Sequence, residues 1–236
     1  MELSAAFVLH HRPYRESSLL VEAFSRDAGR VSLVARGQRQ QSSKKRSVMQ
    51  LFQPLWLSWF GHGELVTLKQ VEVDQAGYRL MGNASLCGLY LNELLVRLLP
   101  LHEAEPELFD AYQQALASLS QNENPQIVLR LFEKQLLAQL GYGLQLMWDV
   151  DTQQPLDDNA DYIYQIESGP QRSTNASANV ISGRSLRHLR EEQGFDEQSL
   201  RQIKGLMRSV INYYLGGRPL HSRQLFAGMN QFKHKA

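Results

Sequence analysis

The spacing of apolar residues changes near residue 80, and the two parts of the chain are predicted to have different secondary structure. Before that point, short runs rich in Val, Leu and Phe are separated by turn residues, which is typical of β-strands. After it, apolar residues recur every three or four positions, which is typical of helices. We predict strands at residues 5–9, 18–24, 30–35, 55–60 and 65–73.

Turn signals suggest how these strands are connected. Residues 11–13, His-Arg-Pro, follow the first run, and Asp27-Ala28-Gly29 joins the second run to the third. Gly29 can take the positive φ that a tight hairpin needs. Five short strands with a long excursion after the third are typical of a small barrel of the OB type, which binds nucleic acid across a strand face. We predict this barrel over residues 1–80.

The helices predicted for residues 81–236 begin and end at residues with capping preferences. Three helices are expected first: 83–99 with Asn83 as N-cap and Pro100 beyond its end, 106–119 beginning at Pro106, and 125–140 ending at Gly141. Two more are expected later in the chain: 184–192 with Ser182 as N-cap, and 197–215 with Asp196 as N-cap. Between the third and fourth helices, a segment of roughly residues 148–179 is polar and acidic, and residues 162–166 within it have the pattern of a short strand. The predicted fold class is α+β: an OB barrel and a helical domain with an irregular acidic excursion.

Charge adds a candidate function. The 236 residues carry a net charge of only +1, yet no Asp or Glu lies between Asp27 and Glu64. That interval holds six cations: Arg30, Arg36, Arg39, Lys44, Lys45 and Arg46. One interpretation is an ordinary solvated loop, and the other is a surface that contacts a phosphate backbone. The last 56 residues are also basic, and their arginines either extend such a surface or balance the acidic middle of the chain.

We hypothesise that the phosphate contacts come from residues on one face of the barrel. They are Arg12, Arg15, Arg36, Arg39, Lys44, Lys45 and Arg46. Tyr14 lies among them, and base stacking and core packing explain it equally well. Contacts to phosphates carry no base information, so binding is expected to be independent of sequence.

Other classes of protein find less support. Cys87 is the only cysteine, which excludes an internal disulfide and a multi-cysteine zinc site. No signal peptide and no apolar run of bilayer length are found, so a cytoplasmic location is expected. The residues between Asp149 and Asp161 include five aspartates, which leaves open a metal-dependent nuclease. An RNA-binding OB protein is the other alternative.

Five blocks together resemble the bacterial RecO family of DNA repair proteins. They are FVLHHRPYRESSLLVEAFSRDAGRVSLVARGQR, LFQPLWLSWFGHGEL, LYLNELLVRLL, LRLFEKQLLAQLGYG and YYLGGRPLHSRQLF, and they span nearly the whole chain in order. The resemblance implies an OB fold followed by a helical domain. It also implies a recombination mediator without catalytic turnover or cofactor, located in the cytoplasm at the nucleoid.

The resemblance further implies partners and sites. Proteins of this family bind single- and double-stranded DNA, anneal complementary strands, work with RecR, and help replace single-strand binding protein (SSB) with RecA. The acidic tail of SSB is implied to dock at Arg130, with Tyr112 as a weaker candidate. Some relatives carry a four-cysteine zinc site in the excursion, but residues 148–179 contain no cysteine, so no metal is expected here.

Overall fold

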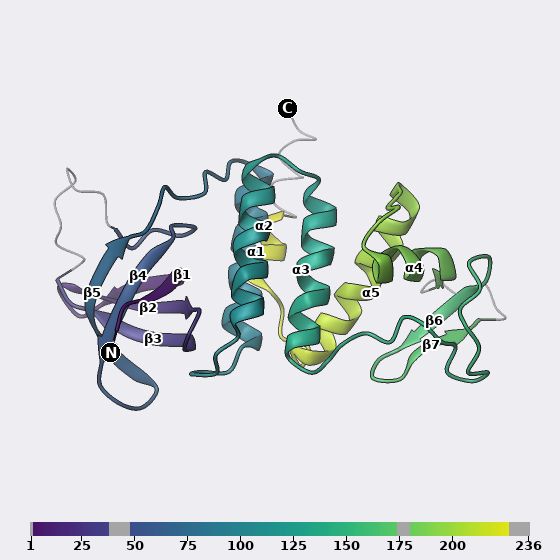
Figure 1. Ribbon diagram of the computed structural model, residues 1–236, viewed down its shortest axis with the longest axis horizontal. Coiled ribbons are helices and arrows are strands. Elements are labelled where there is room, and N and C mark those ends of the chain that lie inside the picture. Colours follow the sequence, from purple (N-terminus) through teal and green to yellow (C-terminus); the bar gives the residue numbers. More distant parts are fainter. Residues whose placement is uncertain (1, 38–47, 174–179, 227–236) are drawn as a thin grey trace. The chain divides into compact units, whose positions relative to one another are not determined.

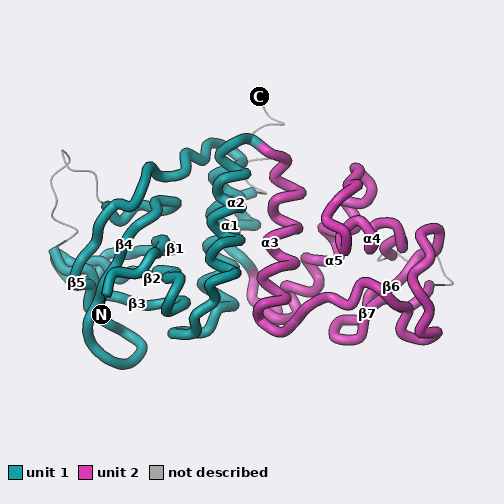
Figure 2. The backbone as a smooth tube through the Cα atoms, viewed as in Figure 1, with its two compact units in different colours: residues 1–122, 220–236 teal, residues 123–219 magenta. Residues whose placement is uncertain are grey.

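The computed structural model describes residues 2–37, 48–173 and 180–226. The chain forms two compact units, of which unit 1 comprises residues 1–122 and 220–236 and unit 2 comprises residues 123–219 (Figure 2). The division that we predicted at residue 80 separates the barrel from every helix. The compact units instead keep the first two helices with the barrel.

Unit 1 contains the predicted barrel (Figure 1). Its strands are β1 Ser4–Tyr14, β2 Ser18–Ser25, β3 Gly29–Ala35, β4 Leu55–Phe60 and β5 Leu65–Val73. They close in the order β1-β2-β3-β5-β4, and β4 pairs again with β1. The β3–β5 pairing is parallel, whereas all other pairings are antiparallel. This is the strand order of an OB barrel, so the predicted fold class is confirmed.

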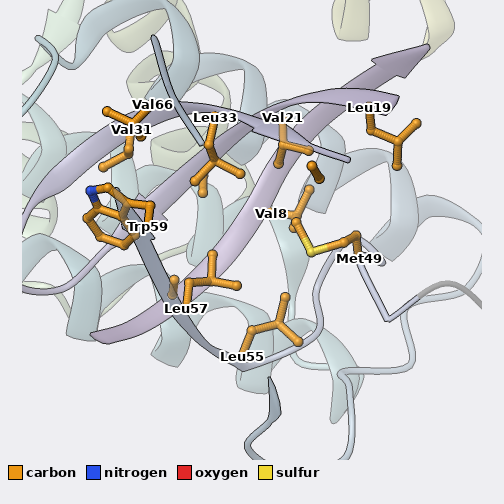
Figure 3. Packing of buried hydrophobic residues seen from close by; sticks show 13 residues of the cluster. Val8, Leu19, Val21, Val31, Leu33, Met49, Leu55, Leu57, Trp59 and Val66 are labelled. Carbon is orange, nitrogen blue, oxygen red and sulfur yellow. The ribbon is translucent and has the colours of Figure 1, made fainter. Parts of the chain in front are cut away.

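The alternation of side chains along the strands produces the core of the barrel (Figure 3). In β3, Val31, Leu33 and Ala35 point inward and are buried, while the residues between them are only partly buried. They pack with inward residues of the other strands, including Trp59 and Val66. Because strand side chains alternate with a period of two, the remaining residues necessarily form the outer face.

Strand β1 is longer than predicted, and residues 11–13 lie within it rather than in a turn. Val8 pairs with Ala23 and His10 with Glu22, so Leu9 is an extra residue in a β-bulge. The strand continues past this bulge to Tyr14, and the turn is made by residues 15–17. Pro13 is tolerated because it stands near the strand end, where a missing N–H costs little.

The hairpin between β2 and β3 is as predicted. Gly29 has a φ of 66°, and its register partner is Ser25. A Cβ at this position would also collide with the carbonyl oxygen of Glu103, in the connection between the two helices of unit 1. Glycine is therefore required twice, by the turn and by the close approach of this connection.

Two helices of unit 1 cover part of the outer barrel face. They are α1 Asn83–Leu98 and α2 Pro106–Ser120. Phe7 of β1 and Phe24 of β2 are paired neighbours that point outward and are fully buried. Each ring lies 5.4 Å from the ring of Phe109 on α2, and Phe7 also meets Tyr112 edge-on at 5.1 Å. The N-cap of α1 is Gly82, one residue before the predicted Asn83.

A buried polar network joins the barrel to both helices. The bulge leaves the carbonyl of Leu9 outside the strand ladder, and this oxygen accepts a hydrogen bond from the Asn92 side chain of α1 at 2.9 Å. The amide oxygen of Asn92 accepts in turn from the Tyr112 hydroxyl of α2 at 2.6 Å. All three residues are buried, so each polar group obtains inside the protein the partner that water would otherwise provide.

Unit 2 contains the remaining elements: α3 Pro125–Gln139, β6 Asp161–Gln165, β7 Gly169–Arg172, β8 Ile181–Ser182, α4 Gly183–Glu191 and α5 Glu197–Tyr214. The predicted caps are confirmed. Ser182 accepts from the backbone N–H of Ser185, and Asp196 forms a capping box with Ser199. None of the helices in the described ranges is long and apolar enough to cross a bilayer.

The acidic excursion is more regular than we predicted. Its β-like patch is β6, which is the centre of a three-stranded sheet in the order β7-β6-β8. We missed β7 because its sequence, Gly-Pro-Gln-Arg, contains no alternation of apolar residues. The sheet packs into the core of unit 2 through Tyr162, which is 2% exposed.

Asp149 holds the excursion together. One carboxylate oxygen accepts from the backbone N–H groups of Asp151 and Thr152 and from the Thr152 hydroxyl, at 2.8–3.0 Å. The other accepts from the backbone N–H of Arg172 in β7 at 2.8 Å. Burial alone would raise the pKa of Asp149, but these hydrogen bonds outweigh it and hold the pKa below its usual value.

We expect Asn92→Ala to destabilise unit 1 by about 3 kcal/mol, because it removes two buried hydrogen bonds, the one to the Leu9 carbonyl and the one from the Tyr112 hydroxyl. Urea unfolding followed through the fluorescence of Trp56 and Trp59 measures this loss. Gln114→Ala on the exposed side of α2 is the control and should change stability by less than about 0.5 kcal/mol. A similarly small effect of Asn92→Ala would contradict the role given to the network.

We expect Asp149→Asn to destabilise the protein by about 2 kcal/mol at pH 7, because an amide nitrogen would face the Arg172 N–H. The lowered pKa fixes the pH dependence. The carboxylate contributes fully above its unfolded pKa of about 3.9 and loses its contribution as the pH falls through the lower folded value. The gap between the variant and the wild type in urea unfolding should therefore narrow near pH 3. Asp161→Asn, at an exposed position, should show no such gap.

Candidate nucleic-acid interface

The outer face of the barrel has a covered end and an open end. The covered end carries the Phe7–Phe24 pair under α2. Toward the other end, strand register aligns outward residues in one row. The row runs Arg12–Leu20–Val34–Thr67–Phe60 across β1, β2, β3, β5 and β4. The three central side chains are half-buried, whereas Arg12 and Phe60 at its two ends are exposed.

Three predicted DNA-binding arginines gather at this open end. Arg12 belongs to the row itself, and Arg15 lies in the turn between β1 and β2, with a φ of 53°. Arg36 directly follows Ala35, whose partner Leu19 is the second residue of β2. Only β2 separates β1 from β3, and neighbouring strands are about 5 Å apart, so these arginines come from strands about 10 Å apart at the same end of the sheet.

Lys69 joins this group, and we did not predict it from the sequence. Ser58 pairs with Gln70 and Trp59 with Leu68, so Lys69 is an extra residue in a second bulge. Leu68 packs against the barrel core, while Lys69 and Gln70 are both exposed. Lys69 lies two residues beyond the paired Thr67, just as Arg36 lies two residues beyond its partner Val34. The sequence of residues 65–73 suggests a regular alternation of inward and outward side chains. The bulge interrupts this alternation, so the position of Lys69 could not be predicted from it.

The cations of unit 1 differ in whether the protein neutralises them. Arg30 pairs with Glu22 at 2.9 Å and donates to the carbonyl of Leu99, so it is neutralised internally, contrary to our expectation for the basic stretch. Arg26 pairs with Asp110 of α2 at 2.7 Å. In contrast, Arg12 and Arg36 form no ion pair with any carboxylate in the described part of the chain. Arg12 and Arg36 therefore carry charge that no carboxylate of the described residues neutralises.

Tyr14 and two histidines complete this surface. The guanidinium of Arg15 lies 5.2 Å from the centre of the half-buried Tyr14 ring, a cation–π contact. His10 and His11 are exposed beside Arg12. Burial, and secondarily the charge of His10, lower the pKa of His11, which is therefore neutral at pH 7. The arginines of this surface are charged at any physiological pH.

Four other predicted residues, Arg39, Lys44, Lys45 and Arg46, lie outside the described residues. The structure describes only the flanks of their segment. It leaves the barrel after Gly37, directly beyond Arg36 at the open end, and rejoins the described chain at Val48. Their contact with DNA stays a prediction.

The two residues predicted to bind the SSB tail are both buried. In unit 1, Tyr112 is fully buried, which raises the pKa of its hydroxyl, and it donates to Asn92. In unit 2, Arg130 is 7% exposed and pairs with Glu133 at 2.6 Å. A role in partner binding stays a prediction for both, and it would require an incoming carboxylate to compete with Glu133 for Arg130.

The acidic residues of unit 2 do not assemble into a common site. Asp149 is saturated by protein donors, Asp158 pairs with Arg187 at 2.8 Å, and Asp151 accepts from Gln171 at 2.9 Å. In the ranges that the structure describes, no three His, Cys, Asp or Glu side chains are placed to hold a metal ion. The nuclease alternative therefore gains no support from the arrangement of these aspartates.

Comparison with known proteins places the chain in a family. The family model for the N-terminal part of recombination protein O matches residues 1–76, and the model for the C-terminal part matches residues 79–224. The chain is 44% identical to the DNA repair protein RecO of Aromatoleum aromaticum, over 96% of this chain and 95% of the relative.

Two further relatives agree. Identity is 44% to the DNA repair protein RecO of Nitrosococcus oceani, over 94% of this chain and 92% of the relative. Identity is 43% to the DNA repair protein RecO of Coxiella burnetii, over 94% of this chain and 97% of the relative. The resemblance inferred from the sequence blocks is thus confirmed over both units, and the chain belongs to the RecO family of DNA repair proteins.

Proposed function

We propose that the open end of the barrel binds single- and double-stranded DNA without sequence preference. The observation that carries the proposal is the cluster of exposed cations at that end: Arg12, Arg15, Arg36 and Lys69. Arg12, Arg36 and Lys69 form no ion pair with a carboxylate among the described residues. Such cations gain most from a polyanion, since binding releases the counterions condensed on DNA. The predicted loop cations Arg39, Lys44, Lys45 and Arg46 extend the same surface in the proposal.

The row of outward side chains suits this role. Leu20, Val34 and Thr67 offer a surface with little capacity to recognise base edges, and Phe60 is 55% exposed at the end of the row. An exposed aromatic ring stacks on any base, with about 1–3 kcal/mol per base. Phosphate contacts and stacking are both tolerant of sequence, as a repair protein that meets arbitrary gaps requires.

In the proposed pathway the protein anneals complementary strands and, with RecR, helps RecA replace SSB on gapped DNA. Annealing follows physically if two strands are held on one cationic surface, because the surface screens their mutual repulsion. Neither step requires a cofactor or catalytic turnover, and we propose none. We place this activity in the cytoplasm at the nucleoid, where the DNA is.

For partner binding we propose that the acidic tail of SSB engages unit 2 at Arg130. The supporting observation is that the Nε of Arg130 is buried and finds no hydrogen-bond partner among the described residues, although the guanidinium is paired with Glu133. An incoming carboxylate could use this donor, because a guanidinium offers five N–H groups in a fixed fork.

The proposal predicts the salt dependence of DNA binding. Each phosphate contact to a single strand contributes about −0.7 to the slope of log K against log[salt], so about six contacts give roughly −4. The variant Arg12→Ala/Arg36→Ala/Lys69→Ala should flatten this slope by about 2. Replacing Arg39, Lys44, Lys45 and Arg46 by alanine should flatten it by about 2, the share that remains of the six contacts. Fluorescence anisotropy with a labelled oligonucleotide at several salt concentrations measures both.

The matched control removes three exposed cations of unit 2, Arg184→Ala/Arg201→Ala/Lys204→Ala, with the same change of net charge. Its slope should stay close to that of the wild type. If the control flattens the slope as much as the barrel variant does, the binding surface is not the barrel end. Competition between DNA and RNA oligonucleotides of the same sequence tests the alternative that the protein binds RNA. That alternative requires RNA to bind more tightly than DNA.

For the SSB tail, we expect Arg130→Gln to weaken binding of an acidic peptide that ends in Phe by about tenfold, while DNA affinity is unchanged. Isothermal titration with the peptide measures this. Arg130→Glu is less informative, because it would place a second carboxylate against the fully buried Glu133. Arg130→Lys keeps the charge but loses the fork and should bind at an intermediate level. Wild-type affinity in both variants would rule out the site.

A further inference from the structure

Unit 2 contains a cleft of about 250 Å³ that neither DNA binding nor the SSB tail accounts for. Residues 141–145, which follow α3, form one wall. Residues Tyr164, Ile166 and Glu167, at the end of β6 and in the β6–β7 turn, form another, and Val210 and Tyr214 of α5 close it. Its size suits one long side chain more than a drug-sized ligand, since pockets for the latter are typically about 300–1,000 Å³.

Aromatic rings dominate this cleft. Tyr142 and Tyr214 stack at 4.0 Å between ring centres, with planes 16° apart. Tyr213 meets Tyr214 edge-on at 5.2 Å. Burial raises the pKa of Tyr164 to about 12 and also raises the pKa of Tyr214, so both are neutral phenols at physiological pH. The faces of neutral phenol rings are electron-rich and attract cations.

A single carboxylate complements the rings. Of the described residues that line the cleft, only Glu167 is charged. Its backbone has a φ of 71° in the tight turn between β6 and β7, and its Oε1 accepts from the Tyr213 hydroxyl at 3.3 Å. The turn and this contact hold the carboxylate in the lining of the cleft, and none of the described lining residues is a cation.

We propose that this cleft binds a basic side chain of a protein partner, with arginine as the preferred residue. A guanidinium can stack its flat face on a tyrosine ring and donate two parallel hydrogen bonds to the carboxylate, whereas an ammonium has neither a flat face nor a bidentate fork. Nucleic acid and acidic peptides are disfavoured, because Glu167 would repel a phosphate or carboxylate and no lining residue would attract one.

The surroundings of the cleft favour a protein over a free small cation. Met147, Trp148 and Tyr213 are 42–52% exposed. The Gln145 side chain, which lines the cleft, binds the backbone of both Met147 and Trp148, and Tyr213 contacts both Tyr214 and Glu167. Exposed apolar side chains around a charged pocket are typical of a contact between proteins, where a central arginine is often the anchor.

The test uses the full chain with isotope-labelled tyrosine rings, titrated with the peptide acetyl-Gly-Arg-Gly-amide and observed by NMR. Tyr→Phe variants assign the ring signals. We expect saturable shifts of the Tyr142 and Tyr214 signals. The matched peptide with citrulline, which keeps the shape of arginine without its charge, should bind at least about tenfold more weakly. Glu167→Gln should cause a similar loss with the arginine peptide. Tyr142→Leu should weaken binding, whereas Tyr142→Phe should retain it.

Each contrary result overturns the proposal. Equal binding of the citrulline peptide, or full binding by Glu167→Gln, would show that charge is not recognised. Shifts of the same rings by dCMP with higher affinity would identify a base-stacking site. Tighter binding of free spermidine than of the arginine peptide would identify a polyamine site. All of these outcomes leave the salt dependence at the barrel untouched, so the two proposals fail independently.

Discussion

The side chain of Asn92 is the contact on which the arrangement of unit 1 depends. A β-bulge at Leu9 leaves a carbonyl outside the ladder, and Asn92 supplies its donor while accepting from Tyr112. One amide thereby fixes β1, α1 and α2 to one another in the interior, where an unmatched polar group would be costly. Strand β1 continues past this bulge, so Arg12 and Tyr14 lie beyond the part of the strand that α2 covers.

The position of the helices decides which part of the barrel can bind a ligand. Phe7 and Phe24 face outward, and such large apolar side chains would be unfavourable in water. α2 covers them, and the cations near it, Arg26 and Arg30, are neutralised by Asp110 and Glu22. At the opposite end of the same face, Arg12 and Arg36 form no ion pair with any carboxylate of the described ranges. Packing and charge therefore select the same end of the barrel as the surface for a polyanion.

The sequence predicts most of the elements because their signals are local. The periodicity of apolar residues predicted the five strands of the barrel. Ser182 and Asp196 predicted the starts of two helices, because their side chains can cap the backbone N–H groups there. What it could not predict depends on pairing between distant segments. The bulge at Lys69 is visible only from the register against β4, and the neutralisation of Arg30 depends on Glu22 in a neighbouring strand. Tyr112 shares the buried face of α2 with Leu108 and Leu116, so helical spacing predicts its burial, whereas its hydrogen bond to Asn92 of α1 depends on a distant segment.

The same reasoning explains how a chain with a net charge near zero can keep a cationic surface. In unit 2 the basic and acidic segments neutralise each other, since Arg187 pairs with both Asp158 and Glu191. Lys134 binds two carbonyls at the end of α4 and the carboxylate of Glu192, where the negative end of the helix dipole favours a cation. On α4 and α5, Arg187, Arg190 and Arg201 thus have carboxylate partners within unit 2. Among the described residues, Arg12, Arg36 and Lys69 at the open end form no such ion pair. This difference in pairing, rather than the total charge, is the reason for proposing that end as the surface for DNA.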